Sequence, residues 1–307
     1  MAGSRISGWG TALPEKVLTN VDLESMMDTS DDWIRERTGI SERRIGGLTS
    51  ALAIEAGQKA LAVSGIAATD IDLLLLATSS ADQIMPATAP TVQHELGLTC
   101  GAFDLNAACS GFVYGLINAY AMAAIGYQRI LLVGSDVLTS WLDYDDRGTA
   151  ILFGDGAGAL VMEPSHQTTL LGSDLGSDGS TRHLLYIDHG GKLVMEGREV
   201  FRQAVRAMVD SSVAAMDQAG VTGDDIALLV PHQANIRILD SACKRLAIPR
   251  DRTAVVLDKT GNTSAGSIPL ALVSAIEKNQ VQKGDLVLFT GFGAGMTWGS
   301  AVVRWDP

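Results

Sequence analysis

Cysteine is scarce in this chain, with three residues among 307. A small, odd number of cysteines in a long chain does not build the disulfide framework of a small secreted domain. The N-terminal segment also lacks the basic and apolar pattern of a signal peptide. We therefore expect a cytoplasmic protein without structural disulfides.

Long apolar runs and an excess of positive charge are lacking as well. The stretch "IDLLLLA" is far too short to cross a bilayer and is typical of a buried strand. The formal net charge of -12 repels polyanions, so we expect neither a nucleic-acid partner nor a membrane partner. Aromatic residues make up only 5% of the chain, whereas apolar residues make up 47% and glycine numbers 33. That composition is typical of a tightly packed α/β enzyme and excludes a disordered chain.

What the chain does contain is an internal repeat. The strand-like runs "TDIDLLLLATSS" and "GDDIALLVPHQAN" each follow an alanine-rich helical pattern and a short turn with glycine. Ile71 and Ile226 in these runs are 155 positions apart. At the same offset "NAACSG" matches "GNTSAG", so that Cys109 pairs with Ser264. The spacing predicts two similar halves, each a sheet covered by helices, that meet near residues 163–175.

Cys109 stands at the start of a helical pattern. The segment "CGAFDLNAA" before it is typical of a strand, and "SGFVYGLINAYAMAAIG" after it has helical apolar spacing. The partial positive charge at a helix N-terminus stabilises a thiolate, the form of cysteine that attacks a thioester carbonyl. A small buried cysteine beside alanines is an equally good interpretation of this stretch alone. Cys100 and Cys243 lack such a setting, and we expect both to be structural.

Polar residues stand at comparable places in the second half. His232 follows an apolar strand pattern that stops at Pro231, and an imidazole at the end of a buried strand is a candidate for chemistry. Asn262 lies in the glycine-punctuated turn "KTGNTSAGS" before another helical pattern. A structural hydrogen bond of the His232 ring and a capping role of Asn262 are the alternatives.

The glycines of "FTGFGAGMTWG" (289–299) invite comparison with a phosphate-binding loop. A dinucleotide fingerprint requires a helix after the glycines, whereas a strand pattern follows them here. The segment instead favours a tight turn whose backbone N–H groups approach a substrate, as an oxyanion hole requires.

The segments "NAACSGF", "PHQAN", "TGNTSAGS" and "GFGAGMTWGSA", in this order and spacing, closely resemble the β-ketoacyl-acyl-carrier-protein synthase III family of the thiolase superfamily. The resemblance covers nearly the whole chain. It implies a thiolase-like α/β fold, in which duplicated βαβαβαββ halves form a five-layer αβαβα sandwich. Residues 1–165 would form the half with the nucleophilic cysteine, and residues 166–307 the half with the histidine and asparagine. It also implies a homodimer.

The resemblance further implies a role for specific groups. Cys109 would accept the acyl group of an acyl-CoA, with the backbone N–H groups of Cys109 and Ala294 as the oxyanion hole. His232 and Asn262 would donate hydrogen bonds to the enolate that forms when malonyl-acyl-carrier-protein loses CO2, since asparagine cannot act as a base. The product would be a β-ketoacyl-acyl-carrier-protein that initiates fatty acid synthesis, without cofactor or metal. A related acyltransferase of secondary metabolism, with another acceptor, is the alternative.

The binding surfaces also carry over from the resemblance. Met85, where relatives often carry phenylalanine, would close the acyl pocket of the partner subunit, and its flexible side chain leaves the primer length open. Plain packing of aromatic residues and an ordinary solvated basic face are the alternatives to the assignments that follow. The residues that would bind CoA and pantetheine are Trp33, Arg37, Thr38, Arg147, Gly148, Phe201 and Asn235. The basic residues that would dock the acidic carrier protein are Arg202, Arg237, Lys244 and Arg245.

Other classes of protein fit the motifs less well. Cysteine hydrolases also use cysteine, histidine and asparagine, but they are usually secreted with disulfides and need their histidine as a base. A biosynthetic thiolase needs a second cysteine in its C-terminal glycine loop, and "GFGAGMTWG" has none. A non-catalytic scaffold of the same fold is disfavoured because all three reactive positions are filled.

Overall fold

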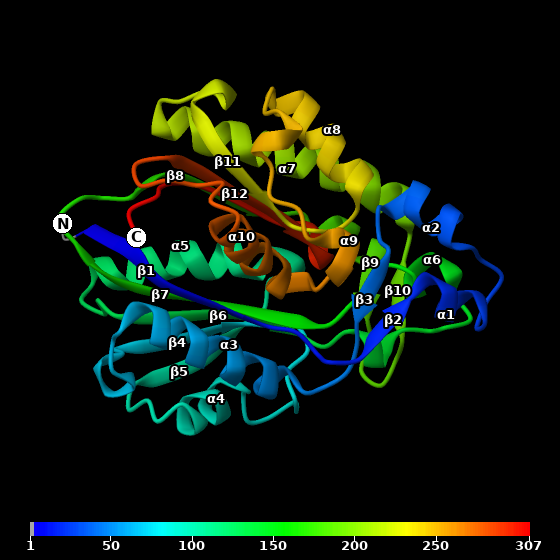
Figure 1. Cartoon of the computed structure of the whole chain (residues 1–307), viewed down its shortest axis with the longest axis horizontal. Coiled ribbons are helices and arrows are strands. Elements are labelled where there is room, and N and C mark those ends of the chain that lie inside the picture. Colours follow the sequence, from blue (N-terminus) through cyan, green and yellow to red (C-terminus); the bar gives the residue numbers. More distant parts are fainter. Residues whose placement is uncertain (1–2) are drawn as a thin grey trace.

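The computed structural model describes residues 3–307. Figure 1 shows two stacked β-sheets with helices between them and on both outer faces. The lower sheet has its strands in the order β1-β7-β6-β4-β5, and the upper sheet has the order β11-β12-β13-β8. This arrangement is the five-layer α/β sandwich expected from the sequence, so the predicted fold class is confirmed.

The first half of the chain builds the lower sheet and its helices. Its strands are β1 (Gly3–Ala12), β4 (Leu73–Ala77), β5 (Gly101–Leu105), β6 (Ile130–Asp136) and β7 (Gly156–Ser165). Its main helices are α3 (Thr49–Ser64), α4 (Ala89–Glu95) and α5 (Gly111–Ala124). Helices α3 and α4 lie on the outer face of the sheet, whereas α5 lies between the sheets (Figure 1). β4 is fully buried and runs parallel to β5 and β6, which explains its uninterrupted apolar sequence.

The second half builds the upper sheet in the same way. Its strands are β8 (Leu170–Ser177), β11 (Ile226–Pro231), β12 (Leu286–Gly293) and β13 (Thr297–Arg304). Its main helices are α7 (Gly197–Ala219), α8 (Ile236–Leu246) and α10 (Ser267–Glu277). Helices α7 and α8 cover the outer face, and α10 lies beside α5 in the central layer (Figure 1). The predicted division at 165/166 falls in the connection between β7 and β8.

Shorter elements gather at one end of the sandwich, on the right in Figure 1. They are β2 (Val17–Thr19), α1 (Asn20–Glu24), α2 (Asp31–Thr38), β3 (Glu42–Arg44), α6 (Arg147–Ala150), β9 (Leu185–Ile187), β10 (Leu193–Met195) and α9 (Leu257–Thr260). The fully buried Arg43 ties this end together, because its guanidinium donates to the carbonyl oxygens of Leu18 and Ile151 at 3.2 and 2.8 Å. These elements surround the C-terminal ends of the central parallel strands, where α/β folds place their ligands.

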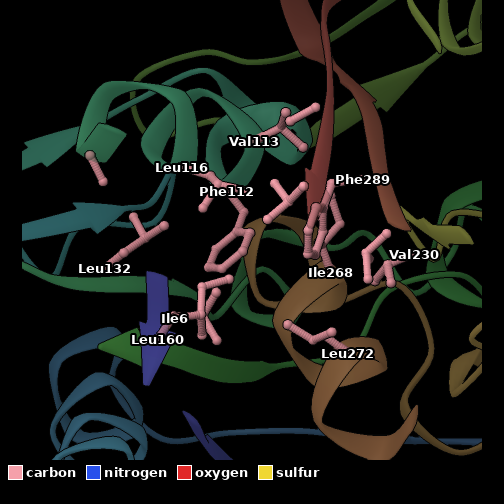
Figure 2. Packing of buried hydrophobic residues seen from close by; sticks show 14 of the residues in the cluster. Ile6, Phe112, Val113, Leu116, Leu132, Leu160, Val230, Ile268, Leu272 and Phe289 are labelled. Carbon is pink, nitrogen blue, oxygen red and sulfur yellow. The ribbon is translucent and has the colours of Figure 1, made fainter. Parts of the chain in front are cut away.

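The core between the two sheets holds the starts of α5 and α10 in place. Phe112 and Leu116 of α5 pack with Ile268 of α10 and Phe289 of β12, and all four are fully buried (Figure 2). At Gly134 the halves meet so closely that a Cβ would lie 2.3 Å from the carbonyl oxygen of Ala265. The core therefore fixes the first turns of both central helices relative to each other.

Across residues 3–307, no helix combines the length and the apolar character needed to cross a membrane.

Candidate active site

Cys109 lies in a 3-10 turn, η2 (Ala108–Ser110), between the end of β5 and the start of α5. The turn is fixed locally, because the Asn106 side-chain oxygen accepts a hydrogen bond from the backbone N–H of Ala108 at 3.1 Å. Ala108 has a φ of 48°, in the left-handed region that non-glycine residues rarely adopt. This turn presents Cys109 at the N-terminus of α5, as the sequence predicts.

The protonation of Cys109 differs from the expectation of a stabilised thiolate. Cys109 is only 6% exposed, and burial raises the pKa of its thiol to about 12. Burial has this effect because the charged thiolate loses its hydration in the interior. The sulfur is therefore a neutral thiol at neutral pH in this structure.

The turn that carries Asn262 has the same construction. The Asn262 side-chain oxygen accepts a hydrogen bond from the backbone N–H of Ser264 at 2.9 Å, and Ser264 has a φ of 49°. A 3-10 turn, η7 (Ser264–Gly266), then leads into α10. The backbone thus matches Ala108 with Ser264, and Cys109 with Ala265. The sequence pairing of Cys109 with Ser264 was wrong by one residue, because it aligned similar side chains instead of similar backbone conformations.

This construction determines which end of the Asn262 amide is available. Its oxygen is engaged by the backbone N–H of Ser264, so the Nδ2 group remains as a hydrogen-bond donor. The sequence left open that Asn262 only caps its own turn. It does cap the turn, but with its side-chain oxygen, so the Nδ2 group can still donate to a ligand.

His232 follows the last residue of β11, and its backbone N–H donates to the carbonyl oxygen of Thr290 at 2.8 Å. The ring is 1% exposed, and burial lowers its pKa to about 3, so the imidazole is neutral near pH 7. Its Nδ1 atom lies 2.7 Å from the hydroxyl oxygen of Ser267, the first residue of α10. The Phe292 ring contacts the imidazole at a centroid distance of 5.8 Å. His232 is thus held between β12 and α10.

The glycine loop approaches the backbone of Cys109 directly. A Cβ on Gly293 would lie 2.6 Å from the Cys109 backbone nitrogen, so only glycine fits at this position. The following 3-10 turn, η8 (Ala294–Met296), places Ala294 on the wall of a cavity that Cys109 also lines. The oxyanion-hole assignment for the N–H groups of Cys109 and Ala294 stays a prediction.

One cavity of about 430 Å³ brings the reactive residues of both halves together, with Cys109, His232 and Asn262 on its wall. The same wall includes the predicted binding residues Trp33, Arg37, Thr38, Gly148, Phe201, Asn235 and Arg237. A second cavity of about 270 Å³ also has Cys109 on its wall, among mostly apolar side chains such as Leu138, Phe153 and Leu193.

The rim of the larger cavity is built around Trp33. The guanidinium carbons of Arg37 and Arg147 lie 4.6 and 4.5 Å from the centroid of its indole ring. Asn235 caps α8 by accepting from the backbone N–H of Arg237 at 2.9 Å, and it donates to the carbonyl oxygen of Arg37 at 3.1 Å. These contacts join α2 to α8 across the cavity mouth.

Known families and solved structures match this chain in sequence and in fold. The family model described as 3-oxoacyl-[acyl-carrier-protein] synthase III matches residues 103–179, and the model of its C-terminal region matches residues 216–305. A β-ketoacyl-[acyl-carrier-protein] synthase III of Roseiflexus castenholzii is 50% identical, over 98% of both chains. A synthase III of Bacillus anthracis is 49% identical, also over 98% of both chains. The chain belongs to the β-ketoacyl-acyl-carrier-protein synthase III family.

Solved structures extend the match. The synthase III of Aquifex aeolicus superposes with a TM-score of 0.97 at 42% identity, covering 99% of this chain and 100% of that one. The priming β-ketosynthase of the R1128 polyketide pathway has a TM-score of 0.95 at 34% identity, covering 99% of this chain and 96% of that one. The resemblance seen in the sequence is therefore confirmed, and the chain is an acyltransferase of the condensing type.

The four basic residues expected to dock the carrier protein do not share one surface hollow. Arg202 and Arg245 line one groove between α7 and α8, together with Arg206, which the sequence interpretation missed. Arg237 lies instead at the main cavity, with its guanidinium 5.8 Å from the Phe201 ring. Lys244 is exposed and lines neither hollow. The spacing of Arg202 and Arg206, four residues apart on one helix face, was a signal that could have identified Arg206.

Two further site residues were not predicted. Asn106 shapes the Cys109 turn and lines the second cavity, and Ser267 contacts His232.

Met85 lies apart from both cavities and is 84% exposed, on the segment between β4 and α4. Within residues 3–307, no group of three or more His, Cys, Asp or Glu side chains is placed to hold a metal ion.

Proposed function

We propose that this chain joins an acyl-CoA primer to malonyl-acyl-carrier-protein through an acyl-Cys109 intermediate, and so initiates fatty acid synthesis. The observation that carries the proposal is that one cavity is lined by a thiol from one half and by an imidazole and an amide from the other. A cysteine supplies the nucleophile, and two neutral donors suit a developing enolate.

The first half-reaction transfers the acyl group from CoA to sulfur. The Cys109 sulfur attacks the thioester carbonyl, the bond to the CoA sulfur breaks, and the thiol proton leaves with CoA as its free thiol. The backbone N–H groups of Cys109 and Ala294 hold the carbonyl oxygen as it gains charge. Because burial raises the pKa of the Cys109 thiol to about 12, a free thiolate is scarce at neutral pH, and the proton passes from sulfur to the departing CoA sulfur as the new thioester bond forms.

The second half-reaction makes the carbon–carbon bond. The bond between the malonyl carboxylate and its α-carbon breaks, CO2 leaves, and the electron pair moves onto the thioester oxygen of the enolate. His232 and the Nδ2 group of Asn262 donate to that oxygen. The α-carbon then attacks the acyl-Cys109 carbonyl, the bond from that carbonyl to the cysteine sulfur breaks, and the released sulfur takes a proton from water. A histidine whose pKa is lowered to about 3 by burial is suited to donation and not to proton abstraction.

The surfaces around the cavity support the expected substrates. The aromatic and cationic rim formed by Trp33, Arg37 and Arg147 suits a nucleotide with phosphates. The arginine groove between α7 and α8 suits an acidic carrier protein, although the chain as a whole carries a charge of -12. Arg237, on the wall of the main cavity, would meet the phosphate of the carrier's pantetheine arm.

A homodimer in the cytoplasm is part of the proposal. β5 is an edge strand of the lower sheet, and Phe103 in its middle is 38% exposed. Ile84 and Met85 nearby in the chain expose 90% and 84% of their surface, which is unusual for apolar residues outside an interface. A second copy that paired along β5 would cover the edge and bring its Met85 toward the acyl pocket.

Intact-protein mass spectrometry tests the proposal. Exposure to a panel of acyl-CoAs should add one acyl mass, and malonyl-acyl-carrier-protein should then remove it with formation of β-ketoacyl carrier protein. Steady release of free acid would identify a hydrolase instead. An acyl-enzyme that malonyl carrier protein cannot discharge would favour transfer to another acceptor, as in secondary metabolism.

A further inference from the structure

A buried serine, Ser267, contacts the Nδ1 atom of the His232 ring. Ser267 is fully buried, and its hydroxyl oxygen lies 2.7 Å from His232 Nδ1. The same oxygen accepts a hydrogen bond from the backbone N–H of Gln233 at 3.3 Å. Both contacts join the start of α10 to the residues that follow β11.

These contacts determine where the protons lie. A backbone N–H can only donate, so the Ser267 oxygen is an acceptor toward Gln233. Among residues 3–307, the other hydrogen-bond partner of this oxygen is His232 Nδ1. If Nδ1 carried the proton, the buried Ser267 hydroxyl proton would have no acceptor. A serine that donates to Nδ1 satisfies both hydrogen-bonding groups, and a neutral ring then carries its proton on Nε2.

The first half of the chain shows that the fold does not need this serine. By the repeat, Ala77 stands at the end of β4 where His232 follows β11, and Gly111 begins α5 where Ser267 begins α10. The two positions face each other in that half too, since a Cβ on Gly111 would lie 3.5 Å from the Cβ of Ala77. The side chains of Ser267 and His232 thus occur together at a contact that elsewhere is made by glycine and alanine.

We propose that Ser267 is a positioning residue that holds His232 in the tautomer with the proton on Nε2. This makes the imidazole a donor toward the cavity and prevents it from acting as an acceptor there. The tautomer itself is independent of the proposed function, whereas its benefit to decarboxylation rests on that function.

The tautomer can be measured on the wild-type protein at pH 7. Protein labelled with 15N-histidine should show, for the buried ring, an unprotonated Nδ1 and a protonated Nε2 in a long-range 1H–15N correlation spectrum. The other four histidines are exposed, and His232→Gln identifies the buried one by loss of its signals. A protonated Nδ1 would overturn the proposal whatever the substrate of the protein is.

Variants then test the consequence. Ser267→Ala should lower kcat for decarboxylation of malonyl-acyl-carrier-protein by roughly 10- to 100-fold, with KM within about twofold. Acylation of Cys109 should stay within about threefold, since it does not use the His232 donor. Ser267→Thr retains the hydroxyl and should recover most of the rate. Ser211→Ala, which removes another buried hydroxyl on α7 away from the catalytic residues, is the matched control and should keep wild-type kcat.

The outcomes separate this inference from the proposed function. If Ser267→Ala decarboxylates within twofold of wild type, or if its His232 keeps the same single tautomer, the serine has no positioning role. If the wild-type protein fails to decarboxylate malonyl carrier protein but shows the Nε2–H tautomer, the tautomer assignment stands and the proposed function fails.

Discussion

The two halves of the molecule use one backbone design for different chemistry. The turns before α5 and α10 share an asparagine that binds the backbone two residues on, a residue with positive φ, and a 3-10 turn. In the first half this frame presents the thiol of Cys109. In the second half it presents the amide of Asn262, and His232 joins it from the end of the neighbouring strand. The frame comes from the duplicated fold, and a few side chains decide what each copy does.

The outer edges of the two sheets differ as well. In the first half β5 is a full strand of five residues beside β4. In the second half the strand that corresponds to β4 has only an isolated bridge, between Leu229 and Thr253, on that side. The first half therefore ends in a five-residue edge strand along which a second copy could pair, as the proposed dimer requires.

The largest effect is expected when the nucleophile of the first half is removed. Cys109→Ala should abolish acyl-enzyme formation and reduce condensation by more than roughly 10⁴-fold, because no other residue supplies the attacking sulfur. Mass spectrometry after acyl-CoA addition measures this directly. Cys243→Ala, which removes a buried cysteine on α8, is the control and should still be acylated. An adduct that remained on the Cys109 variant would end the assignment.

The second-largest effect is expected from the asparagines in the two matching turns, Asn106 and Asn262. Asn262→Ala should lower the rate of condensation by roughly 100-fold or more, because a donor to the enolate is lost. Asn106→Ala removes the matching turn contact without that donor and should cost less than about fivefold. Comparing acylation with malonyl decarboxylation in both variants separates the two roles. An equal loss in both half-reactions for Asn262→Ala would indicate that this residue acts through Cys109 instead.

The open edge of the first half gives a third test. Phe103→Glu in β5 should raise the dissociation constant of the dimer by roughly 100-fold or more, because a charge would be buried in the paired interface. Sedimentation velocity over a range of concentrations measures the effect. Val213→Glu on the outer helix α7 introduces the same charge at a 41% exposed residue and should leave the dimer intact. Identical sedimentation of Phe103→Glu and wild type would refute pairing through β5.

The smallest effects are expected at the outer helices. Arg245→Glu should raise KM for malonyl-acyl-carrier-protein by about tenfold at low salt and leave KM for acyl-CoA within twofold. Lys59→Glu, on the outer helix α3 of the first half, is the matched charge reversal and should change neither constant. If Arg245→Glu changed KM for malonyl-acyl-carrier-protein and KM for acyl-CoA equally, the groove would not be part of the docking surface. Lys244→Glu should have a weaker effect, because Lys244 lines neither hollow.

Much of this organisation was predictable from the sequence. The apolar strands, the repeat and the family motifs gave the layered fold, and they pointed to Cys109, His232 and Asn262, which the structure brings to one cavity. These signals are local or nearly periodic, so they can be recognised in the sequence alone.

The parts that were missed depend on contacts across the fold. Ser267 precedes an apolar helix pattern and looks like an ordinary helix start; only its distance to His232, 35 positions earlier, reveals its role. The pairing of Cys109 with Ala265 required backbone dihedral angles. The high pKa of Cys109 depends on how completely the sandwich covers the thiol, and no stretch of sequence around it records that burial.

Burial of that thiol has a consequence for the lifetime of the protein. Oxidants such as peroxide react with thiolates, and a thiol with a pKa of about 12 offers few of them at neutral pH. We therefore expect the resting thiol to react slowly with peroxide, and the purified protein to keep its activity in air without added reductant.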